Sequence, residues 1–140
     1  REISSKRESF RNAHLSGKSA VDPNEFAITN TDSKFLKSME KAIMDNLNDP
    51  EFGLEQLAEA MIVSRSTLIR KVKGLLNVTP NEYIKVVRLN VAASMLSNGA
   101  DRINDVCYAV GFNTPSYFAK CFKKQFGQLP ADYMKEHRLG

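Results

Sequence analysis

The hydrophobic positions between residues 103 and 133 fall into two short helical segments that a glycine separates. In the first segment, apolar residues recur at i, i+3, i+4 and i+7, at Ile103, Val106, Cys107 and Val110. Gly111 can adopt the left-handed conformation of a helix C-cap, so we expect the first helix to end there. Thr114 as N-cap and Pro115 as first helical residue predict a second helix that runs to about Phe126. Two short helices around a glycine turn are typical of a helix-turn-helix unit.

The second predicted helix has an apolar face and a polar face at helical spacing. Its apolar face holds Phe118, Cys121, Phe122 and either Gln125 or Phe126. Its opposite face holds Ser116, Ala119, Lys120 and Lys123. Short side chains followed by lysines can approach a duplex closely, so this face is a candidate reading surface.

The same periodicity predicts three helices upstream. The first begins at Asp32 as N-cap and ends at Asn48-Asp49-Pro50, and its apolar stripe is Phe35, Leu36, Met39, Ala42, Ile43 and Leu47. The second has the stripe Leu54, Leu57, Ala58 and Met61. The third is capped by Ser64, with an apolar face of Leu68, Val72, Leu75 and Leu76 and an outward face of Ser66, Ile69, Arg70 and Lys73.

A long helix is predicted between these segments and the glycine turn. Thr79-Pro80-Asn81-Glu82 has the form of a capping box with proline at the first helical position, and Asn98-Gly99 is expected to end the helix. After Gly127, Pro130 is expected to begin a short last helix that frays at Gly140.

The two-helix pattern occurs twice in the chain. Leu57 lies 49 residues before Val106 and Met61 lies 49 before Val110, whereas beyond the turn the offset becomes 50. One extra residue in the second turn explains this change. The pairs at an offset of 50 are Leu68 with Phe118, Val72 with Phe122, Leu76 with Phe126, Pro80 with Pro130, and Tyr83 with Tyr133. Matched core positions with proline and tyrosine in register indicate a repeated unit.

These patterns predict an all-α fold of two helix-turn-helix units, about seven helices in all, joined by a long linker helix. The expected boundaries are 32–78 for the first unit, 79–98 for the linker helix and 99–140 for the second unit. Residues 1–31 are polar and show no sustained hydrophobic period, so we expect a poorly ordered linker or tail.

The charge distribution points to a polyanionic partner. The net charge is +4 and the pI about 9.1, with 8 Lys and Arg against 9 Asp and Glu in residues 1–53, and 12 against 7 in residues 54–140. No acid occurs between Glu59 and Glu82 or between Asp105 and Asp132. These windows contain the cations Arg65, Arg70, Lys71, Lys73, Lys120, Lys123 and Lys124. Two acid-free basic windows indicate two contacts with a polyanion.

Candidate chemistry beyond binding is absent from the pattern. Cys107 and Cys121 fall on apolar helical faces, so we expect buried thiols in a reducing compartment rather than a disulfide framework. His14 and His137 have no carboxylate or cysteine at ligand spacing, so no metal or other cofactor is expected. No nucleophile paired with a base and no phosphate loop occurs, so we expect no enzyme. Neither a signal peptide nor a membrane span is expected.

The chain resembles the AraC/XylS family of bacterial transcription regulators, whose DNA-binding domain has two helix-turn-helix units joined by a long helix. The resemblance spans residues 35–137 and rests on AVGFNTPSYFAKCFKKQFGQLPADY at 109–133 and, in the first copy, on LAEAMIVSRSTLIRKVK at 57–73 followed by TPNEYI. The first copy departs from the family pattern at Ile62, where a turn glycine is usual, at Val72, where an aromatic is common, and at Gly74, which interrupts the helix. We therefore expect a looser first unit, or one that reads fewer bases.

The resemblance implies base-reading positions on one helix of each unit. In the first unit they are Ser66, Ile69 and Arg70, where Arg70 could bond guanine O6 and N7 and Ile69 either packs on a thymine methyl or is a partly buried flank residue. In the second unit they are Pro115, Ser116, Ala119 and Lys120. The small side chains at 115, 116 and 119 imply reliance on phosphates and DNA shape. The expected phosphate contacts are Arg65, Thr67, Lys71, Lys73, Tyr117, Lys123 and Lys124.

The sequence thus predicts a sequence-specific regulator domain that inserts two recognition helices into successive major-groove segments of double-stranded DNA. The polar lead-in DPNEFAITNTDSKFL resembles the linker that follows the receiver domain in hybrid two-component regulators of Bacteroidetes, so we expect a receiver or sensor domain upstream. RNA polymerase is a second candidate partner. We expect a cytoplasmic, monomeric domain without membrane contact, with any membrane anchor of the full-length protein in a sensor portion outside this chain. Two alternatives stay open, a helical protein-interaction module and a domain of the DNA-repair alkyl-acceptor type.

Overall fold

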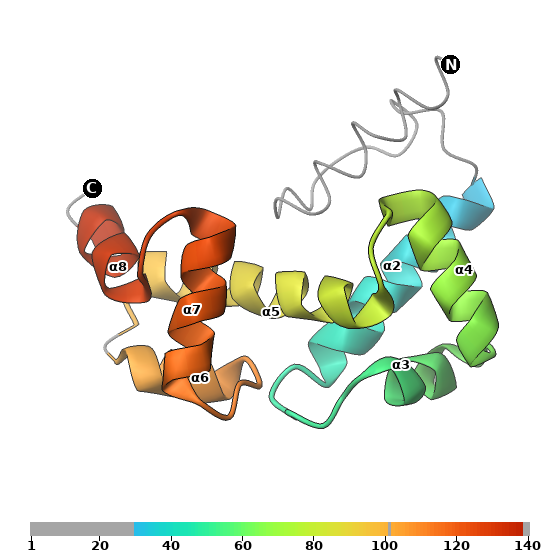
Figure 1. The fold of residues 1–140 in the computed structure, drawn as a ribbon, viewed down its shortest axis with the longest axis horizontal. Coiled ribbons are helices and arrows are strands. Elements are labelled where there is room, and N and C mark those ends of the chain that lie inside the picture. The colour runs from blue at the N-terminus through green and yellow to red at the C-terminus, as the bar shows by residue number, and fades with distance from the viewer. Residues whose placement is uncertain (1–29, 101, 139–140) are drawn as a thin grey trace, which may run out of the picture. The chain divides into compact units, whose positions relative to one another are not determined.

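A computed structural model describes residues 30–100 and 102–138. Over these ranges the chain forms seven α-helices and no strand, which confirms the predicted all-α class (Figure 1). The helices are α2 (Asn30–Asp45), α3 (Leu54–Met61), α4 (Arg65–Leu76), α5 (Pro80–Ser97), α6 (Ile103–Ala109), α7 (Pro115–Phe126) and α8 (Pro130–Arg138). Among the described residues, the first compact unit comprises 30–45 and 52–87 and the second comprises 46–51 and 88–138.

The start of α2 differs from the prediction. Asn30 and Thr31 are already helical, so Asp32 lies in the first turn and is not the N-cap. The remainder of the predicted tail lies outside the described residues, and the domain boundaries stay a prediction. The sequence pattern places Leu47 on the α2 stripe, but the helix ends at Asp45 and Leu47 packs against the core of the second unit.

The core of the first unit follows the predicted stripes. α2 packs on α3 and α3 on α4. The side chains that are most deeply buried are Leu36, Met39, Ile43, Leu57, Leu68, Val72, Leu76 and Tyr83. Because these positions are spaced at three and four residues, each helix buries one stripe and leaves the opposite face in solvent.

Two predicted N-caps of the first unit are confirmed, and the structure adds a third cap that the sequence does not predict. The Thr67 amide donates to Ser64 Oγ at 3.1 Å, while Thr79 and Glu82 exchange bonds of 2.8 and 3.1 Å in a capping box. Hydrogen bonds from Thr79, chiefly from its backbone amide, lower the pKa of Glu82. At the start of α3, the Leu54 amide donates to Asn81 Oδ1 at 3.1 Å, so a side chain of α5 caps this helix across 27 residues.

The turns of the two helix-turn-helix units have the same backbone hydrogen bonds. In the first unit the amides of Ile62 and Val63 donate to Glu59 O and Ala58 O at 3.1 and 3.0 Å. In the second, the amides of Gly111 and Phe112 donate to Tyr108 O and Cys107 O at 3.1 and 3.0 Å. Both are Schellman motifs, in which one residue has left-handed backbone dihedrals. The predicted repeat is therefore present in the local structure, with Ile62 at the position of Gly111.

Ile62 is the strained residue of the first turn. It has φ 57° and ψ 47°, a conformation that a β-branched side chain rarely adopts, and its side chain is 91% exposed. Left-handed backbone costs a non-glycine residue about 1–2 kcal/mol. Since the exposed side chain buries nothing in return, this residue destabilises the first unit.

Replacement of Ile62 by glycine is expected to raise the free energy of unfolding by about 0.5–1 kcal/mol, because relief of the strain exceeds the extra entropy of glycine in the unfolded chain. Urea denaturation monitored by circular dichroism measures this change. Gly74→Ala is a reference, since Gly74 lies exposed in α4, a Cβ added there would have nothing within 4 Å, and the substitution should gain about 1 kcal/mol. A loss of stability in Ile62→Gly would show that the turn is not strained in solution.

The second unit encloses an aromatic core between α5, α6, α7 and α8. The rings of Phe118 and Phe122 are fully buried, and that of Phe122 lies 4.6 Å from Phe126 and 5.3 Å from Tyr133 between centroids. The predicted apolar face of α7 is thus confirmed. The sequence allows either Gln125 or Phe126 at its last position, and both residues are half-buried. Gln125 Nε2 donates to Asn90 Oδ1 at 2.7 Å and so ties α7 to α5.

The ends of the helices in the second unit agree with the prediction in position and differ in one contact. α7 runs from Pro115 to Phe126 with Thr114 as N-cap, but the Thr114 side chain makes no capping hydrogen bond. Gly111 has φ +90° and follows α6, as expected for a left-handed turn glycine.

Buried Arg88 organises the second unit around this turn. It is 6% exposed, and its Nη1 donates to Val110 O at 2.7 Å and to Leu47 O, while Nη2 donates to Asp49 O at 2.9 Å. Burial lowers the pKa of Arg88, and the negative charge of Asp49 opposes this shift. The guanidinium therefore joins the segment 46–51 and the α6–α7 turn to α5.

Candidate nucleic-acid interface

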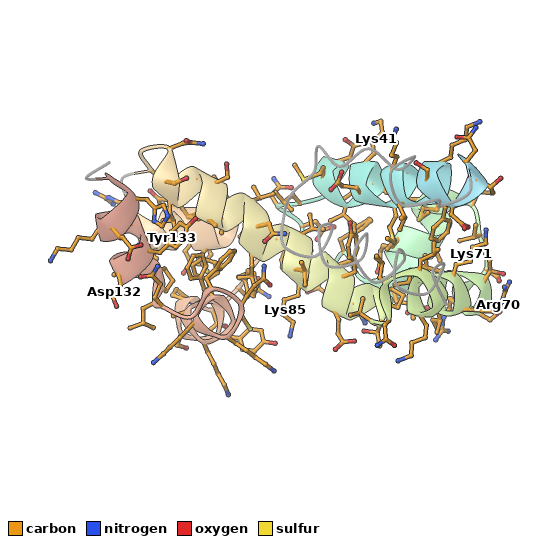
Figure 2. The ribbon with its side chains drawn as sticks, turned by 90° about the horizontal axis from the view of Figure 1, so that it is seen from above. Lys41, Arg70, Lys71, Lys85, Asp132 and Tyr133 are labelled. Carbon is orange, nitrogen blue, oxygen red and sulfur yellow. The ribbon has the colours of Figure 1, made fainter. Side chains whose placement is uncertain are left out.

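The outward face of α4 presents the three predicted base readers of the first unit. Ser66 and Arg70 are exposed, and Ile69 is 42% exposed. Ile69 is therefore a partly buried residue whose exposed part is available to a ligand, which fits both predicted alternatives. They lie on this side because α4 buries the stripe that runs from Leu68 to Leu76. Figure 2 shows the Arg70 side chain projecting away from α2.

The predicted phosphate contacts on α4 differ in their surroundings. Lys73 is exposed, and exposed Arg65 has Nη1 4.0 Å from Glu55 Oε1. Thr67 is half-buried, with its Oγ1 2.8 Å from Ser64 Oγ. The ammonium of half-buried Lys71 lies 5.1 Å from the centre of the Phe35 ring, on the α2 side of α4 (Figure 2). Lys71 is therefore directed toward α2 rather than into solvent.

The outward face of α7 carries the second predicted set. Ser116 and Lys120 are exposed, whereas Pro115 and Ala119 are half-buried. Phe118, Cys121 and Phe122 are buried on the other side of this helix, which fixes its orientation in the second unit. The exposed surface at the start of α7 is therefore made of short side chains, and Lys120 is its one long polar reader.

Two lysines and a tyrosine extend this surface. Lys123 and Lys124 are exposed in the last turn of α7, where positive charge also interacts favourably with the helix dipole. Tyr117 is 49% exposed, and its ring centroid lies 6.0 Å from that of Phe112. Tyr117 therefore packs against Phe112 of the core, and about half of its surface remains accessible.

Both faces carry cations that make no close ion pair. Within residues 30–100 and 102–138, Arg70, Lys73, Lys120, Lys123 and Lys124 form no ion pair. Neither α4 nor α7 contains an acidic residue. A cationic face that is not neutralised within the protein attracts phosphate groups.

The cysteines and histidine do not form a second site. Cys107 and Cys121 are buried, as predicted, and burial raises the pKa of the Cys107 thiol, which lowers its reactivity. The His137 ring stacks on Tyr133 with centroids 3.9 Å apart. In the described part of the chain, no three His, Cys, Asp or Glu side chains gather as metal ligands, and no helix there is long and apolar enough to span a bilayer.

Sequence reasoning missed two residues that connect the helix-turn-helix units to distant parts of the chain. Asn81 caps α3, and Arg88 holds the α6–α7 turn. A signal for Arg88 was present, because it occupies the i+4 row of Ile84, Ala92 and Leu96, where an apolar residue is expected. Asn81 gave no such signal, since its position in a capping box explains a polar residue equally well.

Comparison with known proteins places the chain in a family. A family model described as a helix-turn-helix domain matches residues 57–136. The histidine kinase P4 of Formosa agariphila is 36% identical over 125 residues, which cover 89% of this chain and 9% of that protein. The HTH-type transcriptional regulator MtrA of Neisseria gonorrhoeae is 29% identical over 103 residues, which cover 74% of this chain and 34% of that protein.

A solved structure shows the same fold. The C-terminal domain of AraT, a response regulator from Geobacillus stearothermophilus, is 27% identical and superposes with a TM-score of 0.65. The match covers 71% of this chain and 83% of that domain. The matched residues therefore span most of that C-terminal domain, but a small part of the Formosa relative.

Proposed function

The chain is a DNA-binding domain of the AraC family of helix-turn-helix transcription regulators, and on this premise we propose that α4 and α7 are its reading helices, each inserted into a major groove. The observation that supports this proposal is the surface of these two helices. Each has 12 residues, contains no acid and exposes cations beside short side chains. An α-helix with its side chains is about 10–12 Å in diameter, which matches the roughly 12 Å width of the major groove.

The proposed contacts divide into two kinds. Ser66, Ile69 and Arg70 on α4 and Pro115, Ser116, Ala119 and Lys120 on α7 face the bases. Arg65, Lys73, Lys123 and Lys124, with Thr67 and Tyr117 as hydrogen-bond donors, face the phosphates. Lys71 joins the phosphate set only if its ammonium leaves the Phe35 ring. This division matters because base contacts specify the site, whereas phosphate contacts add affinity on every sequence.

Selection of bound duplexes from a random DNA pool is the primary test. We expect a motif of two blocks whose centres lie about one helical turn, roughly 10 base pairs, apart, because each unit should read one block. A single block would mean that one unit contacts phosphates alone. Failure to enrich any sequence would overturn the proposal of sequence-specific binding.

The variants Arg70→Ala and Lys123→Ala should separate base reading from phosphate contact. Arg70→Ala is expected to cost about 1–3 kcal/mol on the selected site and to relax preference at one position. Lys123→Ala should weaken all duplexes alike and reduce the slope of log K against log salt by about 1. Titration of the selected and a scrambled duplex at several salt concentrations measures both effects.

A charge-matched control for this experiment is Lys41→Ala. Lys41 is exposed on α2, its Nζ bonds Asp45 Oδ2 at 2.8 Å, and it lies on the side of α2 that faces away from α4 (Figure 2). We expect little change in affinity for either duplex. Equal losses in all three variants would show that net charge alone drives binding.

We further propose that the domain is the output module of a longer two-component regulator in the cytoplasm, with a receiver or sensor domain upstream. The names of the Formosa kinase and the Geobacillus response regulator support this context. We assign no catalytic step to the domain itself, since the kinase name refers to a protein of which it covers 9%. An upstream sequence without a receiver's acidic pocket would remove the proposal, and sedimentation of the isolated domain tests its proposed monomeric state.

A further inference from the structure

The side chain of the strained turn residue Ile62 has no packing role within its own unit. Its side chain is 91% exposed, so its removal would open no cavity. Its backbone has φ 57°, which glycine adopts without strain. The matched turn of the second unit has the same hydrogen bonds and uses Gly111. A side chain that occupies a strained conformation without packing inside the fold is a candidate for a contact outside it.

The turn that contains Ile62 leads directly into the first turn of α4, which carries part of the proposed reading surface. Ile62 lies two residues before Ser64, the N-cap of α4. The hydroxyl of Ser64 lies 3.3 Å from Ser66 Oγ and 2.8 Å from Thr67 Oγ1, so the turn is joined directly to the first turn of α4. Ser66 is a proposed base reader, and Thr67 and Arg65 are proposed phosphate contacts. Ile62 is therefore a second exposed apolar residue, in addition to Ile69, in the turn and helix that carry the proposed reading surface.

The charges on the two sides of Ile62 differ. On the α3 side, Glu55 and Glu59 are exposed, whereas α4 carries no acid and presents Arg65 and Arg70. We therefore expect the phosphate backbone of a nucleic acid to approach from the α4 side, where Arg70 and Arg65, the latter 4.0 Å from Glu55, supply positive charge. A duplex offers apolar groups there, namely the deoxyribose C–H groups and the thymine methyl in the major groove.

We propose that Ile62 is an additional DNA contact of the first unit, packing on deoxyribose or a thymine methyl at the edge of the site read by α4. This inference rests on the proposed function. Ile62→Gly removes both the backbone strain and the DNA contact. It should therefore stabilise the first unit and weaken its complex with DNA.

The test compares dissociation constants for the selected duplex and a scrambled duplex. Ile62→Gly and Ile62→Asn both suit a left-handed backbone and both remove the apolar side chain. We expect each to raise the dissociation constant for the selected duplex about 3- to 10-fold, less than the roughly 10- to 200-fold of an apolar group in an enclosed pocket, because the contact lies at the edge of the site. Ile62→Leu keeps an apolar side chain and should bind within twofold of the parent. The salt dependence should stay unchanged in all three, because no phosphate contact is lost.

Gly74→Ala controls for stability, because it should stabilise the same unit without removal of an exposed side chain. We expect its affinity to remain within twofold of the parent. Unchanged affinity of Ile62→Gly and Ile62→Asn, while Arg70→Ala loses binding, would overturn the Ile62 contact and leave the proposed function intact. Unchanged affinity with reduced promoter output in the full-length protein would overturn it in favour of a protein partner. Absence of any preferred duplex for the parent would overturn both proposals.

Discussion

Substitution of Gly111 by alanine is expected to destabilise the second unit by about 4 kcal/mol or more, a large part of the roughly 5–15 kcal/mol that stabilises a typical domain. A Cβ at this position would lie 1.5 Å from Arg88 Nη1 and 2.4 Å from Leu47 O. The guanidinium would have to move and lose its bonds to the carbonyls, each of which contributes about 1.5–3 kcal/mol. The left-handed backbone, with φ +90°, adds about 1–2 kcal/mol. Urea denaturation measures the loss.

Gly127→Ala separates the two contributions to this effect. Gly127 has φ +80°, but nothing lies within 4 Å of a Cβ there, so only the backbone strain should appear, about 1–2 kcal/mol. Similar losses in Gly111→Ala and Gly127→Ala would show that Arg88 does not occupy the α6–α7 turn in solution.

Arg88→Met is expected to reduce the free energy of unfolding by about 3 kcal/mol, although methionine is apolar and has a similar length. The substitution leaves Val110 O, Leu47 O and Asp49 O without the donors that bind them, and a buried acceptor without a partner costs about 1–3 kcal/mol. Asp49 lies in an exposed segment, so water should satisfy its carbonyl and reduce the total. Urea denaturation monitored by circular dichroism measures the effect.

Arg102→Met is the matched control, because Arg102 is an exposed arginine of the same unit whose side chain makes no capping bond. It should change stability by less than about 0.5 kcal/mol. A double-mutant cycle then tests the contact directly. Gly111→Ala should cost less in the Arg88→Met background, since the closest clash is with Arg88 Nη1. Additive losses would contradict the predicted coupling.

The helices could be predicted from the sequence because each follows from local rules. The apolar stripes of α3, α4, α6 and α7 have helical spacing, and the caps at Ser64 and Thr79 lie next to the backbone that they satisfy. Burial of Phe118 and Phe122 followed from the same spacing. The bounds of α2 could not be predicted as well. Asp32 is a good N-cap in isolation, but the preceding Asn30 and Thr31 also fit the helix.

Contacts between distant segments could not be predicted. Lys71 has the composition and phase of a phosphate contact, and only the placement of α2 directs its ammonium to Phe35. Helical phase alone leaves the exposure of Ile69 open, because a position at the edge of a stripe can lie on either side. Asn81 and Arg88 act on backbone that is 27 and 22 to 41 residues away in the chain.

The sequence by itself determined the class of this protein: seven helical segments, a repeated two-helix unit, two acid-free basic faces and the resemblance to AraC-type regulators. These are properties of periodicity, capping and composition, which depend on residues within a few positions of one another. The tertiary structure alone decided that the turn at Ile62 is strained, that the Lys71 ammonium lies near the Phe35 ring and that Arg88 is buried. Those outcomes depend on what lies opposite each residue, and a buried guanidinium or an exposed isoleucine becomes apparent only when the packed neighbours are known.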